Sequence, residues 1–313
     1  MARLTPAARQ HSLFGVPALG KILLYLVVVV FLGAVLAPPI YWMLHEVVDF
    51  PFYRYLSRVT QVTAFVLLVP LLWWLGIRSS SEFGLERNPR AARDALTGLF
   101  LALAPGALFG VVFLMLDVYR IKQDLMPFLL LRIALTAGFV ALVEEFLFRG
   151  VLLGLAVKSF GRWSAVLGVS TVFAGVHFLR PGKQPDSVVE WWSGLAQILR
   201  VFDAAPPPSL WIAGFLSLLT GGMILAFATL GTRSLWLPIG LHAGWIFCQQ
   251  ALQWLAKYRV KPPEALMPWI GPNVVSGAVP TGLVPLGVLL LTGAGVWIYL
   301  RDASADSRGF SGS

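Results

Sequence analysis

Two adjacent glutamates and an arginine stand out inside an apolar stretch that reads Ala141-Leu-Val-Glu144-Glu145-Phe-Leu-Phe-Arg149-Gly150. On a helix, Glu145 and Arg149 share a face and can form an ion pair, whereas Glu144 points about 100° away from Glu145. A charge near the bilayer centre costs about 2.5 to 3.5 kcal/mol, so such residues are functional candidates. A cluster that only locks two helices together is the competing interpretation, but it does not need a second carboxylate. We therefore expect Glu144 to be available for chemistry.

Two histidines follow in later apolar stretches, His177 after Phe173-Ala-Gly-Val and His242 between Gly240 and Gly244. Glu144 precedes Val157 by thirteen residues, and His177 follows Ser164 by thirteen. In an antiparallel helical hairpin the two side chains would lie at similar depth, ~20 Å from the turn. Gly240 and Gly244 are four residues apart and permit close helix packing, so packing is the alternative interpretation of the motif around His242. We expect both histidines to take part in chemistry together with Glu144.

One carboxylate and two imidazoles can activate water for attack on a peptide carbonyl by two routes. In the first, Glu144 with His177 is the general base and His242 stabilises the oxyanion. In the second, Glu144, His177 and His242 hold a divalent metal such as Zn²⁺, which activates the water. No HExxH motif supports the metal route, and no GxSxG motif supports a serine nucleophile.

These residues must be positioned by a membrane protein. Of 313 residues, 58% are hydrophobic and only 12% are charged, whereas a soluble domain has roughly 25% charged residues. The composition excludes soluble nucleotide-binding folds, and the net charge of +9 lies in short loops rather than in a nucleic-acid-binding patch. Cys248 is the only cysteine, so neither an internal disulfide nor a structural zinc site of paired cysteines is possible.

Apolar runs predict an all-α, polytopic integral membrane bundle of about eight transmembrane helices. We expect one integral domain over residues 22–300, with an N-terminal tail at 1–21 and a C-terminal tail at 301–313. Pro38 and Pro39, directly after Ala37, argue against cleavage of the first span as a signal peptide. The expected spans are Ile22 to Leu44, Thr60 to Ile77, Ala95 to Tyr119, Phe128 to Val157, Ser164 to Leu179, Leu210 to Thr232, Leu235 to Ala256 and Thr281 to Leu300.

The basic residues indicate an orientation. Lys and Arg are slightly more numerous in the N-terminal tail and the loops on its side than in the other loops. Both termini are therefore expected in the cytoplasm, and the protein in the plasma (inner) membrane.

The motifs Glu144-Glu145 with Arg149, Phe173 with His177, and His242 resemble those of the CPBP intramembrane endopeptidases, which include CAAX prenyl proteases and bacteriocin-processing or immunity proteins. The resemblance covers about residues 128–256. It implies a cavity among the motif-bearing helices, with Glu144 and His177 activating water and His242 on the oxyanion side. The family often has Asn four residues after the last histidine, where this chain has Ile246.

We expect an intramembrane endopeptidase that cleaves a membrane-associated protein or peptide, with lipid and that substrate as its partners and no nucleic acid. The alternative is a non-catalytic immunity or regulatory protein that binds a peptide in the same cavity, which Ile246 slightly favours. Five costly polar groups argue against a pure binder. A proton-coupled transporter would also use intramembrane Glu and His, but no internal repeat supports it.

Overall fold

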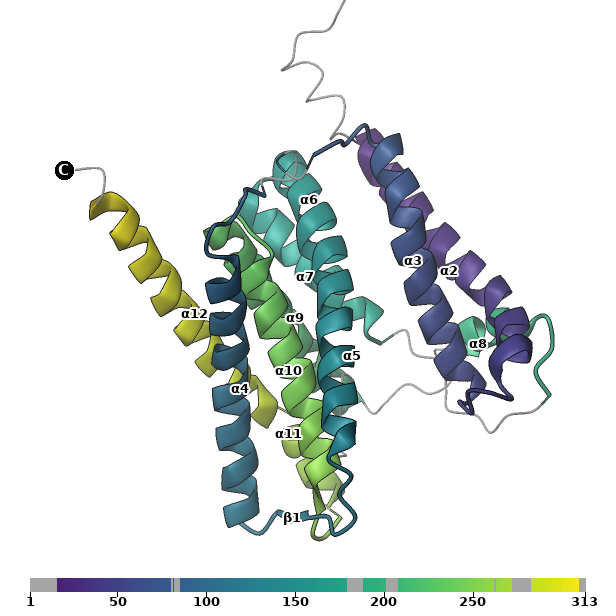
Figure 1. The fold of residues 1–313 in the computed structure, drawn as a ribbon, viewed down its shortest axis with the longest axis vertical. Coiled ribbons are helices and arrows are strands. Elements are labelled where there is room, and N and C mark those ends of the chain that lie inside the picture. Colours follow the sequence, from purple (N-terminus) through teal and green to yellow (C-terminus); the bar gives the residue numbers. More distant parts are fainter. Residues whose placement is uncertain are drawn as a thin grey trace, which may run out of the picture. The chain divides into compact units, whose positions relative to one another are not determined.

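The computed structural model describes residues 16–79, 81, 85–178, 188–200, 208–261, 263–271 and 283–309, which are almost entirely helical (Figure 1). Two three-residue strands, β1 (Tyr119–Ile121) and β2 (Ala256–Tyr258), pair antiparallel. The helices are α2 (Val16–Leu44), α3 (Phe52–Trp74), α4 (Ala91–Met115), α5 (Phe128–Glu145), the π-helix η2 (Phe146–Leu152), α6 (Leu153–Phe160), α7 (Arg162–Val176), α8 (Ser193–Leu199), α9 (Pro208–Thr232), α10 (Trp236–Leu255), the 3₁₀-helix η4 (Glu264–Leu266), α11 (Met267–Ile270) and α12 (Val284–Gly309).

Each of the eight apolar runs contains a helix, and the all-helical membrane class is confirmed. Among the described residues, five helices are long and apolar enough to cross a membrane: α2, α3, α4, α9 and α12. Three charged residues lower the hydropathy of α5, α7 has only 15 residues, and α10 carries three glutamines and His242. The number of eight spans therefore stays a prediction, because α5, α7 and α10 do not meet the criterion of length and apolar composition.

The helix ends differ from the expected tails at both ends of the chain. Helix α2 already begins at Val16, inside the expected N-terminal tail, and α12 continues to Gly309 rather than ending at residue 300. The apolar run does not fix the helix end, because a helix can continue into water beyond its last buried residue.

The chain forms two compact units. Unit 1 comprises residues 1–82 and 178–205 and contains α2, α3 and α8 around Ala34, Ala37, Phe52, Leu56 and Val59. Unit 2 comprises residues 83–177 and 206–313 and holds the other helices, both strands and all five expected site residues. The site therefore belongs to unit 2 alone.

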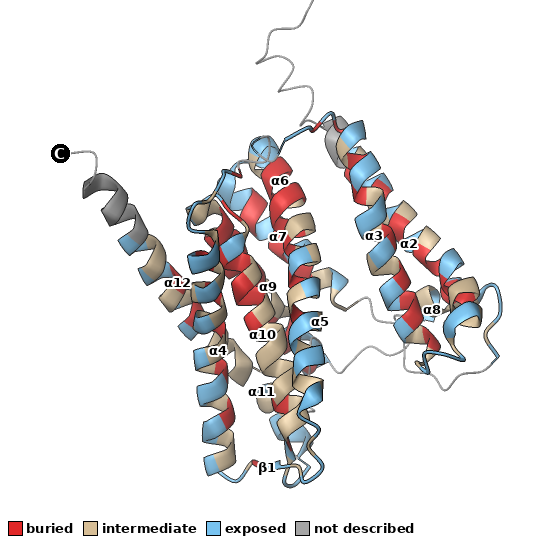
Figure 2. Cartoon of the chain, viewed as in Figure 1, coloured by how far each residue is buried: buried red, intermediate tan, exposed pale blue. Residues whose placement is uncertain are grey.

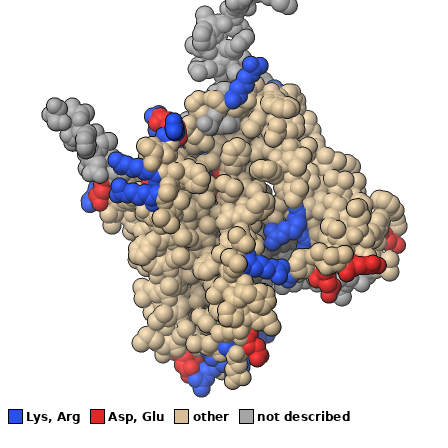
Figure 3. Space-filling view, in the orientation of Figure 1, with Lys and Arg blue, Asp and Glu red and all other residues tan. Residues whose placement is uncertain are grey.

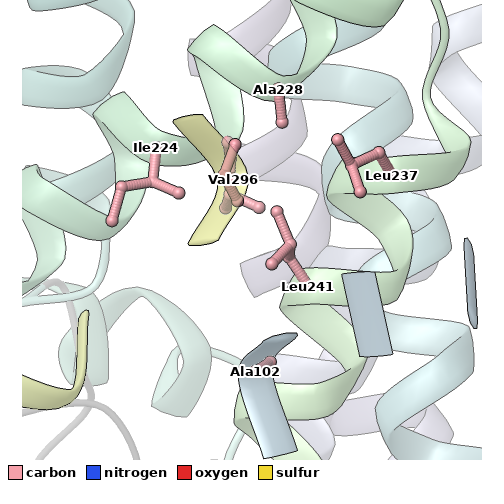
Figure 4. Close-up of a cluster of buried hydrophobic side chains, with 7 residues drawn as sticks. Ala102, Ile224, Ala228, Leu237, Leu241 and Val296 are labelled. Carbon is pink, nitrogen blue, oxygen red and sulfur yellow. The ribbon is translucent and has the colours of Figure 1, made fainter. Parts of the chain in front are cut away.

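Within unit 2, α5, η2 and α6 follow one another without a break from Phe128 to Phe160. Gly161, whose φ of 80° suits glycine, then reverses the chain into α7. Helices α7, α9 and α6 bury an apolar cluster that includes Leu153, Val166 and Phe173. A second cluster joins α4, α9, α10 and α12 (Figure 4); its members are Ala102, Ile224, Leu225, Ala228, Leu237, Leu241 and Val296. The inner faces of these helices are accordingly buried (Figure 2).

Helix α10, which carries His242, packs against α4 with very little room between the backbones. A Cβ on Gly240 would lie 2.0 Å from the Ala95 carbonyl oxygen, and one on Gly98 would lie 2.3 Å from the Leu237 carbonyl oxygen. These clashes involve backbone atoms, which cannot rotate away. A Cβ on Gly244 would likewise lie 2.6 Å from the Ala102 Cβ of α4, so both glycines permit close packing, and this packing fixes α10 beside the site.

Candidate active site

A buried network joins three of the five expected site residues. Arg149 Nη1 donates to Glu145 Oε1 at 2.9 Å, so the expected ion pair is present, with the two side chains 1% and 0% exposed. The same carboxylate oxygen lies 2.7 Å from His242 Nδ1. Glu145 thus connects α5 to α10 and neutralises the buried guanidinium.

Glu144 faces the two histidines from a more open position. Its Oε2 lies 3.9 Å from Nε2 of His177 and 3.9 Å from Nε2 of His242. These distances are too long for direct hydrogen bonds. Yet Oε2 is buried and has no hydrogen-bond partner among the described residues. The Glu144 side chain as a whole is 21% exposed and His177 is 17% exposed, so the described residues enclose neither side chain completely.

The hydrogen bonds at Nδ1 distinguish the two imidazoles. His177 Nδ1 lies 2.7 Å from the Phe173 carbonyl oxygen, which can only accept, so Nδ1 carries the proton and neutral His177 presents a basic Nε2. His242 Nδ1 instead meets the Glu145 carboxylate, and a carboxylate in this position stabilises an imidazolium. His242 is therefore held by Glu145 through Nδ1, whereas His177 is held by a backbone carbonyl and presents a basic Nε2.

Phe173 and Gly222 also hold the network, and the sequence assigned neither a physical role. The Arg149 guanidinium lies 4.2 Å from the centre of the Phe173 ring. The centre of the same ring lies 4.5 Å from the ring centre of His177 and 5.8 Å from that of His242. Arg149 Nη2 donates to the Gly222 carbonyl oxygen at 3.4 Å. A Cβ on Gly222 would lie 3.0 Å from Ser170, so glycine lets α9 approach α7 here.

Arg149 is the central residue of the seven-residue π-helix η2, which lies between α5 and α6. A π-helix inserts an extra residue into a turn and shifts the side chains that follow. Such insertions are frequent at functional sites. Residue counting along an ideal helix could not have detected this irregularity.

The described part of the chain contains no group of three His, Cys, Asp or Glu placed to hold a metal ion. Each Nδ1 atom is hydrogen bonded, an arrangement that metal-binding histidines also have. The two Nε2 atoms share one carboxylate oxygen as their neighbour. This arrangement fits a water molecule between them, because a water can lie about 2.8 Å from both atoms of a pair 3.9 Å apart.

Ile246 lies one helical turn after His242 and is partly buried. Its side chain supplies no hydrogen-bond donor, so the position where the resembling family often has Asn is apolar here. Of the donors present, His242 Nε2 is therefore the one that faces Glu144.

Comparisons with known proteins follow the same segment of the chain. Residues 126–248 match the family model described as type II CAAX prenyl endopeptidase Rce1-like. A search of curated proteins and a search of solved structures each found no match to the chain. The matched segment includes Glu144, Glu145, Arg149, His177 and His242 but covers less than half of the chain. Residues 126–248 are therefore similar to the Rce1-like type II CAAX prenyl endopeptidases, in agreement with the resemblance of the motifs to those of the CPBP proteins.

Proposed function

We propose that this protein is an intramembrane endopeptidase in which Glu144 and His177 activate a water molecule. The observation that carries the proposal is the unpartnered Glu144 Oε2, 3.9 Å from both imidazole Nε2 atoms. A buried carboxylate oxygen without a partner is costly, and a water between carboxylate and imidazole removes the cost. The same water is positioned for deprotonation.

The reaction follows from the two nitrogen environments. Glu144, with His177 beside it, takes a proton from the water as the water oxygen attacks the peptide carbonyl carbon. The carbonyl oxygen becomes an oxyanion, which the imidazolium N–H of His242 stabilises. The C–N bond then breaks, and the proton passes to the leaving nitrogen. The products are a carboxylate and an amine.

Glu145 and Arg149 act behind this chemistry as positioning residues. Glu145 fixes the His242 ring through its Nδ1 atom, and Arg149 compensates the charge of the Glu145 carboxylate at full burial. Neither group needs to touch the substrate.

The family description supports a C-terminal CAAX peptide carrying a prenyl group as the substrate. Such a peptide would reach the site from the membrane, which fits a chain with five apolar helices long enough to cross one. We further propose a location in the plasma (inner) membrane with both termini in the cytoplasm. A metal such as Zn²⁺ remains the alternative water activator, and dialysis against a chelator should leave cleavage unchanged if Glu144 and His177 suffice.

Cleavage of a defined peptide tests the proposal. The purified full-length chain, reconstituted in vesicles, should hydrolyse a farnesylated CAAX peptide, detected by mass of the released tripeptide. Glu144→Gln removes the base and should lower kcat by about 10² to 10⁴-fold. Glu86→Gln, at an exposed ion pair with Arg233, is the matched control and should cleave normally. Equal rates for Glu144→Gln and the parent would refute the assignment.

A non-catalytic binding protein is the second candidate, favoured by the apolar Ile246. This alternative predicts that the parent protein in intact vesicles binds the farnesylated peptide but releases no tripeptide. Binding that is unaffected by Glu144→Gln would then assign the cavity to recognition alone.

A further inference from the structure

The short ribbon formed by β1 and β2 places basic residues in register. Arg120 pairs directly with Lys257 across the two strands. The backbone bonds Lys122 N to Leu255 O (2.9 Å) and Arg259 N to Val118 O (3.0 Å) continue the same register at either end. Because alternate residues of a strand share a face, Arg120, Lys122, Lys257 and Arg259 lie on one face of the ribbon. We call these four residues the basic face.

The opposite face of the ribbon anchors it to unit 2. Tyr119 is 1% exposed and packs 5.1 Å from Phe113 and 5.2 Å from Tyr258, measured between ring centres. The Tyr258 hydroxyl donates to the Gly271 carbonyl oxygen at 3.0 Å. The ribbon is thus fixed by its aromatic side, which leaves the basic face outward.

Two of the four cations are already engaged. Lys122 Nζ donates to the Gln253 carbonyl oxygen, and Arg259 forms an ion pair with Asp117. Arg120 and Lys257 are exposed, and neither side chain has a hydrogen bond or ion pair with another described residue. Like charges directly opposite each other destabilise a strand pair. An anion held between the two side chains would turn this repulsion into attraction.

Large apolar side chains surround the basic face. Met115 and Leu116 at the end of α4 are 80% and 66% exposed, and Phe128 at the start of α5 is 69% exposed. Helix α4 is one of the helices able to cross a membrane. Basic and acidic side chains both gather at this end of unit 2 (Figure 3), and Asp117 is the acidic partner of Arg259 there. A cationic pair beside exposed apolar surface matches the boundary between lipid headgroups and acyl chains.

We propose that the basic face binds the phosphate of an anionic phospholipid, held between Arg120 and Lys257 with its acyl chains along α4 and α5. Tyrosines such as Tyr258 are favoured at this level of a bilayer. The face lies ~20 Å from His242 along α10, since thirteen residues separate His242 from Leu255. Lipid binding here is therefore separate from the proposed catalytic chemistry.

Lipid binding by the full-length protein tests the inference. The purified chain in uncharged detergent micelles is titrated with phosphatidylglycerol, and the bound fraction is counted by native mass spectrometry. The double variant Arg120→Gln/Lys257→Gln should bind about 30-fold more weakly, whereas phosphatidylcholine binding should not change. The charge-preserving variant Arg120→Lys/Lys257→Arg should bind like the parent.

A matched control has the same change in net charge away from the ribbon. Arg87→Gln/Arg162→Gln removes two exposed arginines and should reduce phosphatidylglycerol binding by less than threefold. An equal loss in both double variants would overturn the proposal, because net charge rather than the ribbon would then govern binding. Displacement of the lipid by inorganic phosphate at an equal concentration would also overturn it, in favour of free phosphate.

The melting temperature separates lipid binding from a structural role. In lipid-free micelles, Arg120→Gln/Lys257→Gln should melt at or above the parent temperature, because it removes repulsion across the ribbon. Peptide cleavage in the same micelles should be unchanged. A marked drop in melting temperature would show that the cations support the fold instead.

Discussion

Glu144 and Glu145 are neighbours in sequence but have opposite surroundings. Glu145 is fully buried, and one of its oxygens lies within 2.9 Å of both a guanidinium and an imidazole nitrogen. Glu144 is 21% exposed, and the closest imidazole nitrogens lie 3.9 Å from its buried oxygen. A tightly paired carboxylate holds its neighbours in place, whereas a loosely held one leaves room for water. We therefore propose that support and chemistry are divided between these adjacent residues.

The two histidines should lose activity in different ways. His177→Ala removes a partner of the proposed base and should lower kcat by about 10² to 10⁴-fold, with little change in melting temperature. His242→Ala removes the proposed oxyanion donor and should lower kcat by about 10² to 10³-fold. It also leaves the Glu145 carboxylate without one of its two partners. We therefore expect a lower melting temperature for His242→Ala alone. Cleavage rates and thermal melts of both variants in the same vesicles measure the contrast, and equal melting temperatures would contradict it.

Glu145→Ala is the direct test of the supporting carboxylate. It leaves Arg149 buried without its partner, which should cost about 3 to 5 kcal/mol of unfolding free energy. Glu86→Ala breaks the exposed pair with Arg233, in which both side chains are more than half exposed, and should cost about 0 to 1 kcal/mol. Reversible denaturation in mixed micelles compares the two. An inactive Glu145→Ala protein of unchanged stability would instead assign chemistry to Glu145.

The close packing of α10 on α4 gives a smaller expected effect on stability. Gly240→Ala places a Cβ against the Ala95 carbonyl oxygen, so the helices must separate, at a cost of about 1 to 3 kcal/mol. Gly138→Ala, in α5, meets no atom within 4 Å and should stabilise by about 0.4 to 1 kcal/mol. Opposite signs in the two unfolding free energies are the expected result. A stabilising Gly240→Ala would show that α4 and α10 do not approach closely in the membrane.

The sequence predicts the site motifs better than the geometry that joins them. The pairing of Glu145 with Arg149 follows from a spacing of four residues, and the approach of Glu144 to His177 follows from equal depth on two antiparallel helices. The contact between His242 and Glu145 does not follow from spacing, because 97 residues separate them and only helix packing brings them together. The π-helix at Arg149 does not follow from spacing either, because a spacing argument assumes a regular α-helix.

Ile246 tests how far the oxyanion side of the site depends on His242 alone. An amide one turn after His242 would share its face of α10 and add a hydrogen-bond donor, and one such donor is typically worth about 2.7 to 4 kcal/mol in the transition state. Ile246→Asn should therefore raise kcat or leave it unchanged, while Ile246→Leu, which keeps an apolar side chain of similar volume, should cleave like the parent. The comparison uses initial rates on the farnesylated peptide at saturating concentration, with melting temperatures to confirm the fold. A large loss of activity in a well-folded Ile246→Asn protein would show that an apolar wall is required at this position, so that Ile246 contacts the substrate and His242 stabilises the oxyanion without help.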